Sequence, residues 1–212
     1  MPSSEVSDCV ESALLYIRAG MTHLAAEIRN DALAALEWLL ESAKEAVVAC
    51  PGGWVKTLKA FISMMGWAES NASTKWTSAA KTSLGKGGVF FPRQMLVLAS
   101  FLRVGLGQSP AEEPFHMGKH FPLWDVETQR ISSKSNPFAY LNLFGPARDE
   151  ESQMYEERES RQRVFSQLFQ AAIKKGVESA KREGGELGRA AAVLEKIMRE
   201  SMDDYGDVVE LD

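Results

Sequence analysis

Few residues in this sequence have the types and spacing that chemistry requires. His116 and His120 lie four residues apart, which on a helix would suit a metal ion. They stand among prolines and glycines, however, and no third ligand is near them in the sequence. Structural zinc sites usually have four ligands. We therefore predict that the chain has no metal site.

Other chemical patterns are incomplete. The glycine-rich run LGKGG at 84–88 holds a lysine but lacks the G-x-x-x-x-G-K-[S/T] spacing of a phosphate-binding loop. Acidic residues crowd into 149–159, where an open helix would leave them solvated and without a reason for a shifted pKa. No Ser–His–Asp arrangement can be argued. The sequence predicts a protein with no enzymatic activity and no cofactor.

Composition is that of an ordinary globular protein. The 212 residues are 45% hydrophobic and 25% charged. No apolar run approaches the roughly 18–20 residues that span a bilayer, and no secretory leader is visible at the start. The only two cysteines, Cys9 and Cys50, fit a reducing compartment. We expect no membrane partner.

Charge is unevenly distributed about a net value of −5. Residues 70–111 hold five bases and no acid, and the final run ESMDDYGDVVELD holds six acids and no base. Such segregation indicates solvated tails and electrostatic docking rather than catalysis. We interpret the basic stretch as a solvated surface, with RNA contact as the alternative, since phosphate binding needs only a few such side chains. The candidate RNA-contacting residues are Lys75, Lys81, Lys86 and Arg93.

Apolar residues at spacings of three and four predict helices over 5–19, 26–42 and 54–67, and a fourth from Pro92 to about 107. No strand-like alternation is present, so we predict an all-α fold of HEAT/armadillo-like helical repeats, an α-solenoid. The face of 26–42 is predicted to centre on Ile28, Ala32, Ala35, Leu36 and Leu39. Trp38, Trp54 and Trp67 are interpreted as packing residues. Residues predicted to be buried are Ile28, Leu36, Leu39, Phe61, Ile62 and Leu102.

Four parts follow from these patterns. We predict a repeat region over 1–107 with a flexible loop at 70–90, an extended strap over 108–147, a charged helical region over 148–200, and a disordered acidic tail over 201–212. The run from 148 to 182 is predicted to form one long helix. Its first third is so charged that it must project into solvent or lie on a charged partner, and a last helix is expected at about 186–200.

The segment FPLWDVETQRISSKSNPFAYLNLFG, 121–145, carries many large apolar side chains although its prolines prevent it from being a helix. We favour the interpretation that it docks on a partner protein, filling pockets one side chain at a time. The alternative is that it caps the chain's own helices. The residues predicted to bind a partner, on the strap and the helix after it, are Phe121, Leu123, Trp124, Phe138, Tyr140, Leu141, Leu143, Phe144, Tyr155, Arg158, Arg161, Phe165 and Phe169.

Several strings resemble the fungal pre-rRNA-processing family Ipi-one, which is related to animal testis-expressed protein ten. They are YIRAGMTHLAAEIRNDALAALEWLLESA, CPGGWVKTLKAFISMMGWAES and FPRQMLVLASFLRVGLG, and the similarity continues through 121–166 and 176–200. AAEIRNDALAAL is also similar to the second helix of a HEAT or armadillo repeat. Family members usually begin with a lysine-rich segment and further repeats, whereas this chain opens at PSSEVSDCVE. The resemblance therefore implies a shortened sequence.

The resemblance implies a non-enzymatic subunit of the Rix complex, beside a helical-repeat Rix subunit and a WD-repeat subunit. That complex associates with pre-ribosomal large-subunit particles in the nucleoplasm and nucleolus and supports removal of the second internal transcribed spacer. It works with midasin, an AAA ATPase that we expect this chain to meet only indirectly. The alternative is a helical-repeat module that contacts pre-rRNA directly.

Overall fold

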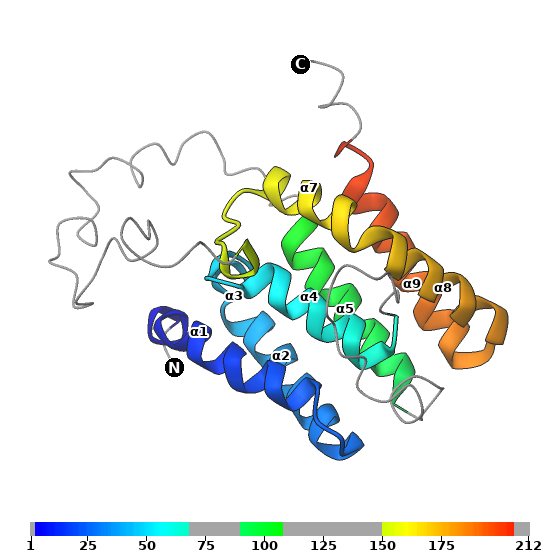
Figure 1. Cartoon of the computed structure of the whole chain (residues 1–212), viewed down its shortest axis with the longest axis horizontal. Helices are drawn as coiled ribbons and strands as arrows, with labels where there is room; N and C mark the ends of the chain where they lie inside the picture. Colours follow the sequence, from blue (N-terminus) through cyan, green and yellow to red (C-terminus); the bar gives the residue numbers. More distant parts are fainter. Residues whose placement is uncertain (1–2, 68–89, 108–149, 206–212) are drawn as a thin grey trace, which may run out of the picture. The chain divides into compact units, whose positions relative to one another are not determined.

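The computed structural model describes residues 3–67, 90–107 and 150–205 (Figure 1). Within these ranges every regular element is helical, with eight α-helices, one short 3-10 helix and no strand. For the described residues, the prediction of an all-α fold is confirmed. The strap, the loop at 70–89 and the end of the acidic tail at 206–212 lie outside the described residues.

The helices begin and end largely where the sequence predicts. Pro92 lies in the first turn of the helix 91–106, where its missing N–H has no partner to lose. Gly52 and Gly66 flank the helix 53–65, both at φ 68°, a conformation that favours glycine. The elements are α1 (Ser3–Met21), α2 (Ala26–Ser42), α3 (Lys44–Ala49), α4 (Gly53–Met65), α5 (Phe91–Leu106), η3 (Glu150–Ser152), α7 (Arg158–Leu168), α8 (Gln170–Glu183) and α9 (Gly185–Met202).

Neighbouring helix pairs share one hydrophobic core. α1 packs on α2 and α4, α2 packs on α5, and α5 packs in turn on α7 and α9, while α8 packs on α9. Figure 1 accordingly shows α4 and α5 between the α1–α2 pair and the α7–α9 group. The buried apolar residues of all these helices form a single cluster. The C-terminal helices are therefore part of the core that the N-terminal helices begin.

Tryptophan rings fill the space that two glycines leave open between helices. Trp54 of α4 is fully buried, stacks on Phe101 of α5 with ring centres 5.2 Å apart, and lies 6.5 Å from Phe165 of α7. A Cβ atom at Gly105 would lie 2.2 Å from the Trp54 ring, and one at Gly176 would lie 2.2 Å from the ring of Trp67. These close approaches bring α4 against α5, and bring Trp67, which follows α4, against α8.

Ile28 is a correction to the predicted face of α2. Leu36, Leu39, Phe61, Ile62 and Leu102 are buried as predicted, but Ile28 is 43% exposed and Ala35 is also exposed. The buried face of α2 includes Arg29 instead of Ile28. Arg29 can be buried because its guanidinium donates to the carbonyl oxygens of His23 and Leu24. A packing role is confirmed for Trp54 and Trp67, whereas Trp38 is 54% exposed.

The prediction of one long helix over 148–182 is wrong. Residues 153–157 are not helical, and the helix breaks again at Phe169, a buried residue with φ −122° between α7 and α8. The break lets α7 pack on α5 and α8 pack on α9. Of the charged residues before Arg163, Glu156, Glu157 and Glu159 are exposed as predicted, whereas Arg161 is buried. The helix predicted to end at about 200 runs to Met202.

Candidate protein-binding site

The structure places six of the residues predicted from the sequence to bind a partner or RNA. Those outside the described residues are Phe121, Leu123, Trp124, Phe138, Tyr140, Leu141, Leu143, Phe144, Lys75, Lys81 and Lys86. Their roles stay predictions. Those inside are Arg93, Tyr155, Arg158, Arg161, Phe165 and Phe169.

Arg93 joins α5 to α2. Its guanidinium donates to Asn30 Oδ1 at 2.6 Å and to Glu37 Oε2 at 2.7 Å. A carboxylate of the chain itself therefore neutralises the charge that RNA contact would use, although 37% of the Arg93 side chain stays exposed. A test of RNA contact should therefore change Lys75, Lys81 and Lys86 and leave Arg93 in place.

Arg158 and Arg161, three residues apart on the first turn of α7, hold the C-terminal end of α5. Arg158 Nε donates to the Leu106 carbonyl oxygen at 2.6 Å, and Arg161 Nε donates to that of Gly105 at 2.7 Å. The last carbonyl groups of a helix have no partner within it and carry the negative end of its dipole. The two guanidinium groups give these carbonyl oxygens hydrogen-bond donors, and their positive charge faces the negative end of the helix dipole.

Arg161 is the buried member of the pair. Its Nη1 donates to the carbonyl oxygens of Tyr155 and Glu156 at 2.8 and 2.7 Å, and its Nη2 lies 3.6 Å from Glu45. The Trp54 indole N–H donates to the Arg161 carbonyl oxygen at 3.2 Å. Burial lowers the pKa of the Arg161 guanidinium, and the Glu45 carboxylate opposes that shift. The Arg161 side chain thus holds the segment that precedes α7 against the end of α5 and against α3.

Asp204 extends this arrangement to the end of α9. Its carboxylate pairs with Arg158, whose Nη2 lies 2.9 Å from Oδ1, and it accepts a second bond from Gln162 Nε2 at 3.0 Å. The hydrogen bond from Arg158 is the main reason that the pKa of Asp204 falls to about 2, against the opposing effect of burial. Arg158 and Gln162 also donate to the Ser201 carbonyl oxygen. We name the group Arg158, Arg161, Gln162 and Asp204 the α5 end clamp.

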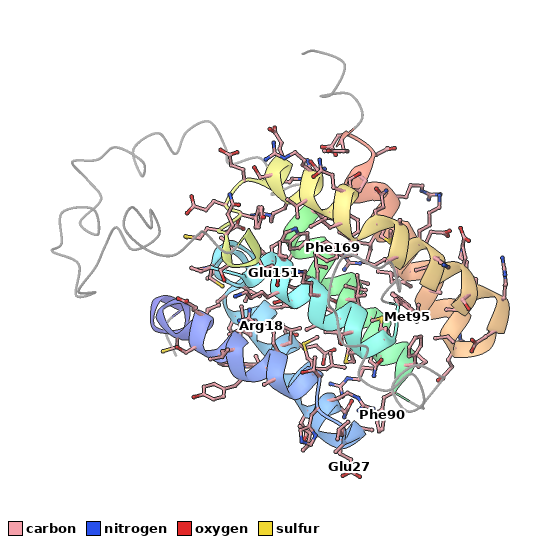
Figure 2. The ribbon with its side chains drawn as sticks, viewed as in Figure 1. Arg18, Glu27, Phe90, Met95, Glu151 and Phe169 are labelled. Atoms are coloured by element: carbon pink, nitrogen blue, oxygen red, sulfur yellow. The ribbon has the colours of Figure 1, made fainter. Side chains whose placement is uncertain are left out.

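The aromatic residues predicted on this helix lie inside the chain. Tyr155 is 8% exposed, Phe165 is fully buried, and Phe169 is 3% exposed, as its position among the helices shows (Figure 2). The structure therefore brings the predicted residues of 155–169 together in the interior. Gln162 and Asp204 were missed, because Asp204 meets Gln162 and Arg158 across 42 and 46 residues of sequence and no local pattern marks such a pairing.

An open groove of about 440 Å³ runs between α1 and α4. Arg18 lies on its wall (Figure 2) and donates to the Gly52 carbonyl oxygen at 3.1 Å. Lys59, also on the wall, pairs with Glu151. Near it, burial raises the pKa of the Cys50 thiol to about 11, which leaves a protonated and unreactive sulfur at neutral pH. The lining residues are Leu15, Arg18, Ala19, Thr22, Lys56, Lys59, Ala60, Ser63 and Glu151.

The described residues hold neither a metal-binding cluster nor a membrane-spanning helix. Within 3–67, 90–107 and 150–205, no three His, Cys, Asp or Glu side chains gather in the way that a metal ion requires. In the same part of the chain, no helix combines the length and the apolar character needed to cross a membrane.

Comparison with known proteins decides the family. Residues 4–102 match a family model described as a Rix1 complex component involved in 60S ribosome maturation. The pre-rRNA-processing protein ipi1 of Sclerotinia sclerotiorum is 57% identical over 98% of this chain. The chain belongs with the fungal Ipi1 proteins. The resemblance seen in the sequence is thereby confirmed.

Further Ipi1 relatives support the assignment. The protein of Chaetomium thermophilum is 49% identical and that of Pyricularia oryzae 46% identical, each over 98% of this chain. The chain covers 62% of the Sclerotinia and Chaetomium proteins and 63% of the Pyricularia protein. It thus spans less than two thirds of the length of the Ipi1 relatives that it matches.

Proposed function

We propose that this chain is a non-enzymatic scaffold subunit of the Rix complex and acts in pre-rRNA processing and large-subunit maturation in the nucleus. The observation that carries the proposal is the similarity to Ipi1 proteins along almost the whole chain, together with the match of 4–102 to a Rix1 complex component. Partners on this proposal are the Rix subunit, the WD-repeat subunit and the pre-ribosomal large-subunit particle, with midasin reached through them.

The arrangement of the helices supports a scaffold. We interpret α1, α4 and α7–α8 as one row and α2, α5 and α9 as a second row, stacked like the paired helices of a short HEAT-type solenoid. Such stacks offer extended surfaces to other proteins. The shifted pKa values also have structural explanations. Burial is the main cause at Arg18, Cys50 and Arg161, and the hydrogen bond from Arg158 within the α5 end clamp is the main cause at Asp204.

We assign binding of the Rix subunit to the strap over 108–147. Its large apolar side chains are too many to leave in water at roughly 25 cal/mol per Å² of apolar surface. The prolines remove backbone donors, so side chains must supply much of the affinity. Because Tyr155, Phe165 and Phe169 are buried in this chain, we concentrate the proposal on Trp124 and Phe144.

Co-purification with the Rix subunit tests this assignment. The double variant Trp124→Ala, Phe144→Ala is expected to lose the subunit while its melting temperature stays near that of the parent chain, because interface energy concentrates in a few large anchors. Leu168→Ala, which shortens an exposed apolar side chain on α7, is the matched control and should retain the subunit. An intact complex with a destabilised chain would mean that the strap only caps its own helices.

Direct contact with pre-rRNA is the second candidate, favoured by the five bases and no acids of 70–111. A variant with Lys75, Lys81 and Lys86 changed to Gln should then bind a fragment of the second spacer more weakly. The dependence of binding on salt should also be shallower, because fewer phosphate charges are neutralised. Filter binding at two salt concentrations measures both. If the variant binds the RNA fragment as the parent does and still forms the Rix complex, direct RNA contact is ruled out and only the scaffold role is left.

A further inference from the structure

The outward face of α2 exposes large apolar side chains on a helix that is firmly held. Ile28 and Trp38 are 43% and 54% exposed. They lie ten residues apart, with Asp31 and the exposed Ala35 between them at spacings of three, four and three. This spacing puts all four residues on one side of the helix. We call Ile28, Asp31, Ala35 and Trp38 the α2 face.

The opposite side of α2 is anchored in the core. Its buried residues are Arg29, Ala32, Leu33, Leu36, Leu39 and Leu40. Gly20 of α1 approaches Ala32, and Arg93 of α5 bonds Asn30 and Glu37 on a third side. The α2 face is thus preorganised, so a partner would not have to order the helix in order to bind it.

Charge on the exposed surface of α2 is of one sign. Glu27, Asp31 and Glu41 are exposed, and Glu27 lies at the outer end of the helix (Figure 2). The single base of the helix, Arg29, is buried against the carbonyl oxygens of His23 and Leu24. Glu37 is engaged by Arg93. The nearest exposed base along the chain is Lys44, which lies in α3 beyond the end of α2.

We propose that the α2 face binds a basic amphipathic helix of a partner protein. Such a helix would cover Ile28 and Trp38 with apolar side chains at matching spacings, and its lysines or arginines would lie beside Glu27, Asp31 and Glu41. The small side chain of Ala35 lets the two helices approach closely between the larger residues. The α2 face contains no residue of the strap.

Charge argues against the other occupants. A two-fold dimer through this face would set the acids of one copy against those of the other, which is unfavourable. Nucleic acid and anionic lipid carry the same sign of charge as the face and would be repelled. A partner helix rich in bases and apolar residues is the chemistry that fits both features.

A synthetic peptide tests the proposal on the full chain. The probe is a fluorescein-labelled helical peptide of leucine and lysine at amphipathic spacing, and its binding is followed by fluorescence anisotropy. Trp38→Ala and Asp31→Lys are each expected to raise the Kd at least about tenfold, which corresponds to about 1.4 kcal/mol. A leucine–glutamate peptide of the same pattern should not bind the parent chain.

Matched variants away from α2 separate this site from general attraction to an acidic protein. Leu168→Ala on α7 and Glu178→Lys on α8 remove the same kinds of group from other exposed positions and should change the Kd less than twofold. Equal effects of both sets, or no effect of Trp38→Ala in a chain with unchanged melting temperature, would overturn the proposal. So would a dimer in sedimentation that Trp38→Ala dissociates, since the occupant would then be a second copy.

Discussion

At the scale of single residues, Gly105 is a position where the gain of a methyl group should be costly. Alanine normally stabilises a helix by about 0.5–1 kcal/mol relative to glycine. Here the new Cβ would lie 2.2 Å from the buried Trp54 ring, which Phe101 and Phe165 hold in place. We expect Gly105→Ala to lower the free energy of unfolding by about 1–3 kcal/mol, as overpacked cores do. Urea denaturation measures the change.

Gly188 supplies the control for that substitution. It lies in α9, and the nearest heavy atom to an added methyl group would be 3.8 Å away, an ordinary contact. Gly188→Ala should therefore leave stability unchanged or raise it by up to about 1 kcal/mol. Equal destabilisation of the two variants would show that the Trp54 ring is not the cause.

Asp204 should make stability depend on acid pH. Its pKa is about 2 in the folded chain and about 3.9 when unfolded, so the unfolded state binds more protons. The stability that its pairing with Arg158 supplies is complete above about pH 5 and is lost as the pH falls toward 2. Asp204→Asn should be less stable than the parent at pH 7, and the difference should shrink between pH 5 and 2.5.

Urea titrations at several pH values measure that difference. Asp203→Asn changes the exposed neighbour, for which the structure gives no ion pair, and should match the parent throughout. A gap between Asp204→Asn and the parent that stays constant with pH would contradict the role of the ion pair.

At the scale of the elements, Arg161 joins α7 to α5. Alanine at this position would remove the bonds to the carbonyl oxygens of Gly105, Tyr155 and Glu156. A buried acceptor left unpaired costs roughly 1–3 kcal/mol. We therefore expect Arg161→Ala to lose at least about 2 kcal/mol of unfolding free energy, measured by chemical denaturation. Arg161→Lys should recover only part of it, because an ammonium group cannot reproduce the planar fork.

Arg163 tests whether charge alone explains that loss. It lies on the same helix but is exposed. Arg163→Ala should fall within about 0.5 kcal/mol of the parent, as surface substitutions usually do. Comparable losses at both positions would mean that α7 is sensitive to any change of charge.

Local sequence signals predicted where helices lie better than they predicted which side of a helix is buried or where a helix is interrupted. The apolar spacing placed the start of α4 within one residue, since it depends on neighbouring residues, whereas the predicted end at 67 ran past Gly66, where the helix stops. The break at Phe169 was not predicted, because Phe165 and Phe169 are buried by α-helices distant in sequence, which propensity does not report. Ile28 was misplaced because hydrophobicity alone put it inward, whereas hydrogen bonds to a turn draw Arg29 inward instead.

The candidate site shows the same limit more strongly. Arg158 and Arg161 were chosen from the sequence as charged residues for a partner's rim, yet both bond to the last carbonyl groups of α5. That contact joins positions 52 and 56 residues apart. Such pairings arise from the packing of whole helices, so a spacing rule cannot reveal them. The exposure of Trp38 likewise became visible only when the neighbours of α2 were in place.

At the scale of the whole molecule, α5 connects the two ends of the core. It packs on α2 and on α9, so the second and the last α-helix of the described residues share one central neighbour. The predicted boundary after 107 therefore separates helices that bury each other. Without α9, a fragment ending at 107 would leave the side of α5 that packs on it in water.

This shared neighbour predicts one cooperative unfolding transition for the full chain. Leu36 of α2 and Leu194 of α9 are both fully buried, and each contributes to the single hydrophobic cluster. Leu36→Ala and Leu194→Ala should each lower the unfolding free energy by about 2–5 kcal/mol. Both should shift the same transition in calorimetry and in urea. Stacked repeats can instead unfold separately when their interfaces are weak. Two transitions, with Leu36→Ala moving one and Leu194→Ala the other, would show that α5 does not couple the helix pairs on either side of it.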